Sequence, residues 1–335
     1  MRHTIIIAEA GVNHNGDLTL AKRLVDAAAD AGADYIKFQT FRSEELVAKS
    51  AKMADYQKEN LQAEDDSQLA MLKRLELSEA DHRELISYAA ERGIRFLSTA
   101  FDLASIDFLH SLQPDFWKVP SGEITNLPYL RKIAEKGGRV VMSTGMCAIS
   151  DVLAAVEALT DAGVKRDDIT LLHCNTQYPT PFADVNLRAM QHLADATGLS
   201  VGYSDHTVGI EVPIVAVALG ACVIEKHITL DRTLPGPDQA ASIEPDELRR
   251  MVAAIRNIEQ ALGSGVKEIT ASERPNIAAA RKSIVAKRAI AKGELLSDSN
   301  LTAKRPGTGL SPMRWDEVVG TRAVRDFDED ELIEL

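Results

Sequence analysis

Two lysines stand in apolar segments of the sequence, where a charged side chain is unusual. Lys37 lies within Tyr35–Thr40, and Lys118 lies within Phe116–Gly122. Burial of an ammonium group without a partner is unfavourable by several kcal/mol. Each lysine therefore needs an opposite charge, either from a nearby Asp or Glu or from an anionic ligand that the two lysines share.

Small hydroxyl side chains occur near the ends of similar segments. They are Ser98, Thr99, Ser121, Ser143 and Ser204. Two ammonium groups surrounded by hydroxyl and backbone donors form a cradle for a phosphate or a carboxylate. The pattern favours a bound anion over two separate ion pairs.

Two histidines follow the last pair of apolar segments, at His206 and His227. Neighbouring strands lie about 4.8 Å apart, so two side chains at the same height can share one ion. Imidazoles suit Mn, Fe, Co or Zn, and a site with few protein ligands leaves positions for substrate oxygens. A lone histidine on a strand is more often structural, but the paired placement favours a metal site.

Carboxylates also follow strand-like segments. Glu9 and Glu123 are candidates for general acid–base chemistry or for binding sugar hydroxyls. The rigid turn Pro235–Pro237 delivers Asp238 just after the eighth segment. A plain turn explains the prolines and glycine equally well, so Asp238 is a weaker candidate.

The segments that must position these groups are short, β-rich and separated by helical stretches. They are Thr4–Ala10, Tyr35–Thr40, Arg95–Asp102, Phe116–Gly122, Val140–Gly145, Ile169–Asn175, Leu199–Asp205 and Cys222–Thr229. Eight such strands, with no glycine-rich dinucleotide turn after the first, predict a (β/α)8 TIM barrel, with a doubly wound open sheet as the alternative. Barrel sites lie at the carboxyl ends of the strands, where the polar candidates occur.

Two regions depart from the alternation. Ser43–Leu77 spans about 35 residues, too long for an ordinary loop between a strand and a helix. It is predicted to be a lid or partner contact, or else a solvated helical insertion. We expect a catalytic barrel over 1–263, a linker over 264–282 and a small β-rich domain over 283–335.

Composition excludes several classes of protein. The chain has 335 residues, with 50 acidic and 38 basic side chains and a net charge of −12. This acidic balance argues against generic binding to nucleic acid or to an anionic membrane, and no apolar run approaches a membrane span of about 18 residues. Three cysteines indicate buried thiols in a reducing compartment, which predicts a cytoplasmic protein.

Seven ordered motifs resemble those of the bacterial sialic acid synthases, which include N-acetylneuraminate and N,N'-diacetyllegionaminate synthases. The motifs are Ala8–Gly16, Ile36–Thr40, Lys118–Glu123, Ser143–Met146, Tyr178–Pro181, Ser204–Thr207 and Pro235–Asp238. The tail, with Lys304–Gly307, resembles the antifreeze-like (SAF) domain of that family.

The resemblance implies a transferase that joins phosphoenolpyruvate to an open-chain N-acyl hexosamine and releases phosphate. It implies phosphoenolpyruvate contacts from Lys37, Thr99, Lys118, Ser121, Ser143 and Ser204. His206 and His227 would bind a divalent ion, expected to be Mn²⁺ with Mg²⁺ or Co²⁺ possible, and Glu9 would lie beside the reacting carbons. The implied acceptor contacts are Gln39, Glu123, Asn175, Tyr178 and Asp238, with Arg305 reaching across a domain-swapped homodimer.

Departures from the family pattern bear on the acceptor sugar. Asn175–Tyr178 and Ala280–Ser283 are more similar to legionaminic acid synthases, whose acceptor is 2,4-diacetamido-2,4,6-trideoxymannose. N-acetylneuraminate synthesis from N-acetylmannosamine is the first alternative, and a pseudaminate-type acceptor is another. A barrel acting on a sugar phosphate, and a non-catalytic glycan- or ice-binding protein, are the remaining hypotheses.

Overall fold

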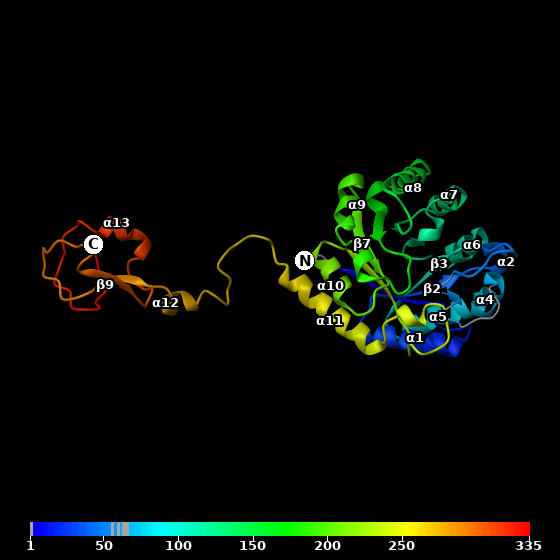
Figure 1. Cartoon of the computed structure of the whole chain (residues 1–335), viewed down its shortest axis with the longest axis horizontal. Helices are drawn as coiled ribbons and strands as arrows, with labels where there is room; N and C mark the ends of the chain where they lie inside the picture. The colour runs from blue at the N-terminus through cyan, green and yellow to red at the C-terminus, as the bar shows by residue number, and fades with distance from the viewer. Residues whose placement is uncertain (1–2, 55–56, 59–60, 62–66) are drawn as a thin grey trace. The chain divides into compact units, whose positions relative to one another are not determined.

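The computed structural model describes residues 3–54, 57–58, 61 and 67–335, and it divides into two compact units, Met1–Gly263 and Ser264–Leu335. Figure 1 colours the first unit from blue to yellow and the second from yellow to red. Within the described residues, no helix is both long enough and apolar enough to cross a lipid bilayer.

The first unit is built on one eight-stranded sheet. Its strands are β1 (Ile5–Gly11), β2 (Tyr35–Thr40), β3 (Arg95–Ala100), β4 (Trp117–Val119), β5 (Val140–Ser143), β6 (Ile169–His173), β7 (Ser200–Asp205) and β8 (Val223–His227). The order is β3-β2-β1-β8-β7-β6-β5-β4, and every ladder is parallel. The terminal strands β3 and β4 contact each other. The predicted (β/α)8 barrel is therefore confirmed, and the open sheet is excluded.

Helices connect and cover the strands (Figure 1). They are α1 (Leu18–Ala31), α5 (Glu79–Glu91), α6 (Leu103–Ser111), α7 (Leu127–Lys136), α8 (Ile149–Asp161), α9 (Ala189–Thr197), α10 (Glu211–Ala218) and α11 (Pro245–Ala261). Local sequence sets their ends. Helix α5 begins at a capping box in which Ser78 and Asp81 exchange hydrogen bonds. Helix α1 ends at Gly32, whose left-handed conformation (φ 81°) suits glycine.

The interior of the barrel contains two layers of side chains that differ in chemistry. The lower layer is apolar and consists of Ile7, Tyr35, Leu97, Phe116, Val141, Leu172 and Val223, joined by Cys222. On β7 the corresponding position is Gly202, where a Cβ would approach the carbonyl O of Val223 to 2.5 Å. Because strand side chains alternate between faces, the residue two positions later on each strand also points inward. These residues form the upper layer, and they are Glu9, Lys37, Thr99, Lys118, Ser143, Cys174, Ser204 and Glu225.

The described part of the 43–77 segment contains α2 (Ser43–Leu46) and α4 (Gln68–Leu75). Residues 55–56, 59–60 and 62–66 lie outside the described residues. The apolar side chains of α4 are buried against residues that follow β1 and β2, in a cluster of Val12, Phe41, Met71, Leu72 and Leu75. The described part of the insertion contains two helices, as the prediction of a helical insertion requires, but the apolar face of α4 packs on the barrel and is not solvated.

The second unit has its own small core. Strands β9 (Ser283–Ala286) and β10 (Leu301–Lys304) pair antiparallel, and α12 (Asn276–Ala280) and α13 (Trp315–Val318) flank them in sequence. Buried side chains such as Ile284, Leu301 and Phe327 form one cluster. The predicted small β-rich module is confirmed.

Candidate active site

A cavity of about 490 Å³ opens at the carboxyl ends of the barrel strands. It is lined by most of the residues predicted from the sequence, which are Glu9, Lys37, Gln39, Thr99, Lys118, Ser121, Glu123, Ser143, Tyr178, Ser204, His206, His227 and Asp238. The fold thus brings into one chamber side chains that are up to 229 residues apart in the chain. The upper layer forms its floor.

The two lysines are held by buried glutamates. Lys37 Nζ lies 2.7 Å from Glu9 Oε2 and 3.6 Å from Glu225 Oε2, and it donates to Thr99 Oγ1 at 3.0 Å. Lys118 Nζ lies 3.5 Å from Glu225 Oε1 and donates to Ser143 Oγ at 2.8 Å. The ion-pair alternative is therefore realised for both lysines. Both also line the cavity, so they remain available to an anion.

The two glutamates ionise differently although both are buried. Burial raises the pKa of Glu9 to about 7, against the lowering effect of Lys37. Burial also opposes ionisation of Glu225, but Lys118 and Lys37 together outweigh it and hold its pKa well below the usual range. At neutral pH Glu225 is a carboxylate, whereas Glu9 can gain or lose a proton.

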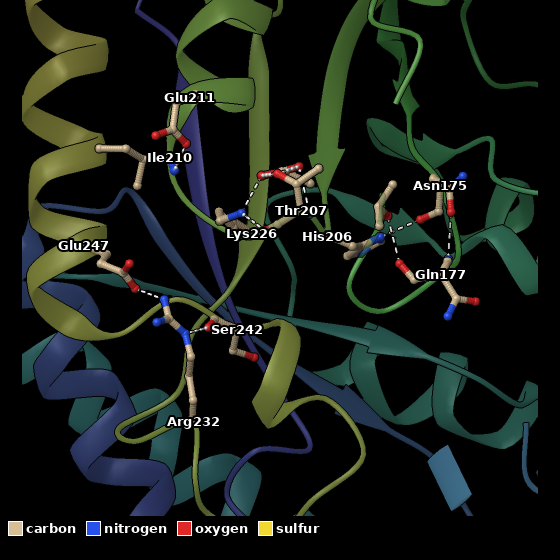
Figure 2. Close-up of polar contacts among 12 residues, drawn as sticks. Asn175, Gln177, His206, Thr207, Ile210, Glu211, Lys226, Arg232, Ser242 and Glu247 are labelled. Atoms are coloured by element: carbon tan, nitrogen blue, oxygen red, sulfur yellow. Dashed lines mark hydrogen bonds and ion pairs between the residues drawn. The ribbon is translucent and has the colours of Figure 1, made fainter. Parts of the chain in front are cut away.

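The two histidines meet at the same end of the barrel, with ring centroids 5.4 Å apart. His206 Nδ1 donates to the backbone carbonyl of Asn175 at 2.5 Å, which leaves its Nε2 as the unprotonated nitrogen (Figure 2). Among the described residues, His227 Nδ1 is buried without a hydrogen-bond partner. Burial lowers the pKa of both rings, that of His206 to about 4, so both are neutral at pH 7. Two neutral imidazoles with open nitrogens fit a divalent ion.

The pair of imidazoles does not form a complete cage. In the part of the chain that the structure describes, no group of three or more His, Cys, Asp or Glu side chains is arranged to hold a metal. Water or substrate oxygens would have to fill the other positions of an ion held here. The Tyr178 ring lies 4.0 Å from His206 and 5.5 Å from His227, measured between centroids.

Carboxylates and amides stand around the mouth. Gln39 Nε2 donates to Glu9 Oε1 at 3.4 Å. Glu123 accepts from Asn126 Nδ2 at 2.6 Å, and burial raises its pKa. Burial raises the pKa of Asp238 to about 6. These groups present oxygen and nitrogen atoms suited to a polyhydroxylated ligand.

Two predicted residues, Asn175 and Arg305, are not among the residues that line this cavity. The side-chain oxygen of Asn175 accepts from the backbone N–H of Gln177 at 2.7 Å. Its contribution to the site is the backbone carbonyl that binds His206. Arg305 belongs to the C-terminal unit, where it is exposed and its Nε donates to the carbonyl O of Ala280 at 3.1 Å.

Sequence reasoning left two features of the cavity unassigned. Glu225 bridges the lysines, and its position two residues before His227 indicates that it faces the same side of β8. The other feature is an apolar wall. It consists of Val12, Phe41, Leu46, Val47, Met71, Leu72, Leu75 and Phe101, most of which come from the 43–77 insertion. No local sequence pattern predicts this wall, because its residues come together only when the insertion packs on the barrel.

Comparison with known proteins decides the family. The NeuB family model matches residues 24–267, and the SAF domain model matches residues 281–334. The chain belongs to the NeuB family. The resemblance drawn from the sequence motifs is thus confirmed for both parts, and this NeuB protein is an enzyme.

Several relatives of this NeuB protein are similar to it over most of their length. It is 54% identical to the N,N'-diacetyllegionaminic acid synthase of Campylobacter jejuni, over 99% of each chain. It is 51% identical to the enzyme of the same name from Legionella pneumophila, over 95% of this chain and 89% of the relative. The crystal structure of an N-acetylneuraminic acid synthetase from Leptospira borgpetersenii, in complex with citrate, superposes with a TM-score of 0.73. That match has 37% identity and covers 82% of this chain and 90% of the other.

Proposed function

We propose that this enzyme condenses phosphoenolpyruvate with 2,4-diacetamido-2,4,6-trideoxymannose to give N,N'-diacetyllegionaminate and phosphate. The observation that carries the proposal is one cavity that is lined both by Lys37 and Lys118 and by His206 and His227. The two relatives that are more than half identical, both named N,N'-diacetyllegionaminic acid synthase, support the choice of product.

Phosphoenolpyruvate would bind through the two lysines. Its phosphate and carboxylate carry the negative charge that Lys37 and Lys118 can neutralise, and Thr99, Ser121, Ser143 and Ser204 supply hydroxyl donors. Glu225 lies beside both lysines and favours their charged forms. Burial opposes the charged form of each lysine. Glu225 and Glu9 outweigh it at Lys37 and raise the pKa of that side chain, whereas burial prevails at Lys118 and lowers its pKa.

His206 and His227 would hold a divalent ion, which we propose to be Mn²⁺, with Mg²⁺ and Co²⁺ as alternatives. When bound, such an ion supplies Lewis-acid polarisation of a carbonyl oxygen. The residues prepare for it in two ways. Burial keeps both imidazoles neutral, and the carbonyl of Asn175 fixes the tautomer of His206.

The acceptor sugar would lie between the floor and the insertion. Gln39, Glu123, Tyr178 and Asp238 offer partners for its hydroxyl and amide groups. The apolar wall offers contact for the methyl groups of a 6-deoxy, diacetamido sugar, which has fewer hydroxyls than N-acetylmannosamine. This wall is the structural support for the legionaminate-type acceptor over the neuraminate-type one.

In the reaction, C3 of phosphoenolpyruvate forms a bond to the aldehyde carbon of the open-chain sugar. Water then adds to C2, and the C2–O bond to phosphate breaks. Positioning of both reactants in one chamber supplies much of the rate enhancement. Glu9 stands beside Lys37 with a pKa of about 7, so its carboxylate can take the proton that the attacking water loses. Glu123, with a raised pKa, is the second candidate for proton transfer.

We also propose a domain-swapped homodimer in the cytoplasm. The exposed guanidinium of Arg305 in the C-terminal unit is available to an acceptor bound to another copy, and the three cysteines are free thiols, as a reducing compartment would keep them. Mixing an Arg305→Ala protein with a Lys118→Ala protein tests the swap. Recovery of part of the activity is expected, and no recovery would count against shared sites.

The function itself is tested with purified protein, Mn²⁺ and phosphoenolpyruvate. The sugar is either 2,4-diacetamido-2,4,6-trideoxymannose or N-acetylmannosamine, and phosphate release and product mass are measured. We expect a nine-carbon 2-keto acid from the first sugar at the higher kcat/KM. A preference for N-acetylmannosamine would make the enzyme an N-acetylneuraminate synthase. No phosphate release with any hexosamine would favour a non-catalytic role.

A further inference from the structure

An ion pair lies at the ends of β7 and β8, on the face of these strands that points away from the cavity. Asp205 and Lys226 are register partners on the two strands, and both side chains are fully buried. Lys226 Nζ donates to the Asp205 carboxylate and, at 2.8 Å, to the carbonyl O of Thr207. Asp205 Oδ1 also accepts from Thr207 N at 3.1 Å and from Thr207 Oγ1 at 2.9 Å. The three residues thus link the two strand ends, and Figure 2 shows Lys226 beside Thr207.

Each member of this pair directly precedes a histidine of the cavity. Asp205 precedes His206, and Lys226 precedes His227. Successive side chains of a strand point to opposite faces, and the histidines line the cavity whereas Asp205 and Lys226 are not among its lining residues. The ion pair and the imidazoles are therefore opposite faces of the same two strand ends.

The stability of the fold does not by itself account for charges at this position. A buried ion pair is often no more stabilising than apolar residues of the same size. One step back on the outer face of the same strands, Tyr203 and Ile224 are register partners and belong to the apolar core. The charged pair adds geometric specificity, because charge-assisted hydrogen bonds fix the separation and the orientation of the two strand ends that they join.

The two imidazoles depend on their strands to different degrees. His206 is held on its far side by the carbonyl of Asn175. His227 Nδ1 makes no hydrogen bond to any described residue. The orientation of His227 must therefore come from the backbone that carries it and from packing, and Lys226 anchors that backbone.

We propose that Asp205, Lys226 and Thr207 form a positioning clasp that sets the separation and orientation of His206 and His227 for a divalent ion. The inference rests on the metal site of the proposed function. The clasp touches neither the substrates nor the ion. It acts through the two strand ends, as the outer partners of metal ligands do in other sites.

The test measures the Kd of the full-length protein for Mn²⁺ alone, from the electron paramagnetic resonance signal of free Mn²⁺. The variants are Asp205→Asn and Lys226→Met, each checked for folding by circular dichroism and Tm. A positioning role predicts weaker binding in both variants, by about tenfold or more. A purely electrostatic role predicts opposite directions, because loss of the carboxylate weakens and loss of the ammonium strengthens attraction of a cation.

Thr207→Val provides a milder variant, which removes one hydroxyl donor to Asp205 and keeps the charges. We expect it to fold and to bind Mn²⁺ several-fold more weakly. The matched control is Arg256→Met, which breaks the ion pair between Arg256 and Asp34, 2.8 Å long, on the barrel's opposite end near Thr4. It should lower Tm without changing the Kd for Mn²⁺.

Wild-type affinity in folded Lys226→Met and Thr207→Val would overturn the clasp, as would tighter binding by Lys226→Met. Those results would leave the proposed function intact, because the wild-type protein would still bind the ion. If the wild-type protein binds no Mn²⁺, Mg²⁺ or Co²⁺, the metal part of the proposed function fails, and the clasp fails with it.

Discussion

The lower and upper layers of the barrel interior use the same strands and differ by two residues along each. The lower layer, from Ile7 to Val223, is apolar and packs so closely that β7 has room only for Gly202. The upper layer contains two lysines and two glutamates in contact with one another. The lower layer packs the core of the barrel, and the upper layer places charged side chains at the cavity. The comparison shows that residues only two positions apart on the same strands can serve stability in one layer and chemistry in the next.

The sharpest way to break this division is to remove a charge from the upper layer. Lys118→Met keeps most of the length of the side chain but removes the cation that faces Glu225 and Ser143. We expect kcat/KM with phosphoenolpyruvate to fall by about 100- to 1000-fold, the range for loss of one preorganised electrostatic group. Steady-state phosphate release measures it. Activity within a factor of two of wild type would contradict the assignment of Lys118 to the anion site.

A core substitution in the lower layer should reduce the stability of the protein and leave its activity largely unchanged. Leu172→Ala removes a fully buried side chain and is expected to reduce the free energy of unfolding by about 2–5 kcal/mol. Urea denaturation measures the loss, and kcat per folded molecule should remain near that of wild type. Cys174→Ala, two residues later on the same chain segment, is the matched control with a smaller loss. Equal losses of unfolding free energy in the two variants would show that the two layers contribute equally to stability.

The buried carboxyl group of Asp238 should make the stability of the protein depend on pH, in the direction expected of a group that destabilises the fold when it is ionised. Burial raises its pKa from 3.8 to about 6. The folded state therefore holds a proton that the unfolded state has lost between about pH 4 and pH 6, and the stability this provides is lost as pH rises through that window. Asp238→Asn removes this dependence and should stabilise the protein at pH 7 by up to about 3 kcal/mol relative to wild type, from the two-unit shift.

Denaturant unfolding of wild type and Asp238→Asn at pH 4, 5, 6 and 7 provides the measurement. The stability difference between the two proteins should grow as pH rises. A difference independent of pH would show that Asp238 does not carry a raised pKa. Glu157→Gln, which alters an exposed carboxylate of α8 outside the cavity lining, serves as the control.

The smallest expected effect concerns the apolar wall. Leu46 is half-buried and lines the cavity. Leu46→Asn should lower kcat/KM for the trideoxy acceptor about tenfold, the scale of one lost apolar contact, and should change the value for N-acetylmannosamine less. Leu46→Met keeps an apolar surface and should behave as wild type. Equal losses for both sugars would mean that the wall does not select the acceptor.

Much of the site could be predicted from local sequence because strand residues follow a strict period. Once β1 and β2 are recognised, Glu9, Lys37 and Gln39 must appear at their carboxyl ends, and a parallel barrel directs all such ends to one side. The prediction was less accurate at β4, which spans only Trp117–Val119 and continues as a 3-10 turn over Ser121–Glu123. Ser121 nevertheless lines the cavity from that turn.

Other features could not be read locally because their partners come from distant segments. Lys37 and Glu225 are separated by most of the barrel and meet through the pairing of β1 with both β2 and β8. The family resemblance implied Asn175 as a contact of the sugar, and the structure adds that its backbone carbonyl accepts a hydrogen bond from His206. Tautomer choice depends on a backbone group, and the identity of a residue carries no information about where its carbonyl points.

The sequence by itself determined which chemical groups lie at the end of each strand, and these groups indicate the family and are the basis of the anion and metal sites that we propose. Tertiary structure decided how those groups are shared: one glutamate between two lysines, one ion pair behind two histidines, and an insertion folded back as an apolar wall. The physical reason is that side-chain type and alternation are local properties, whereas charge pairing and burial depend on register and packing between segments far apart in the chain.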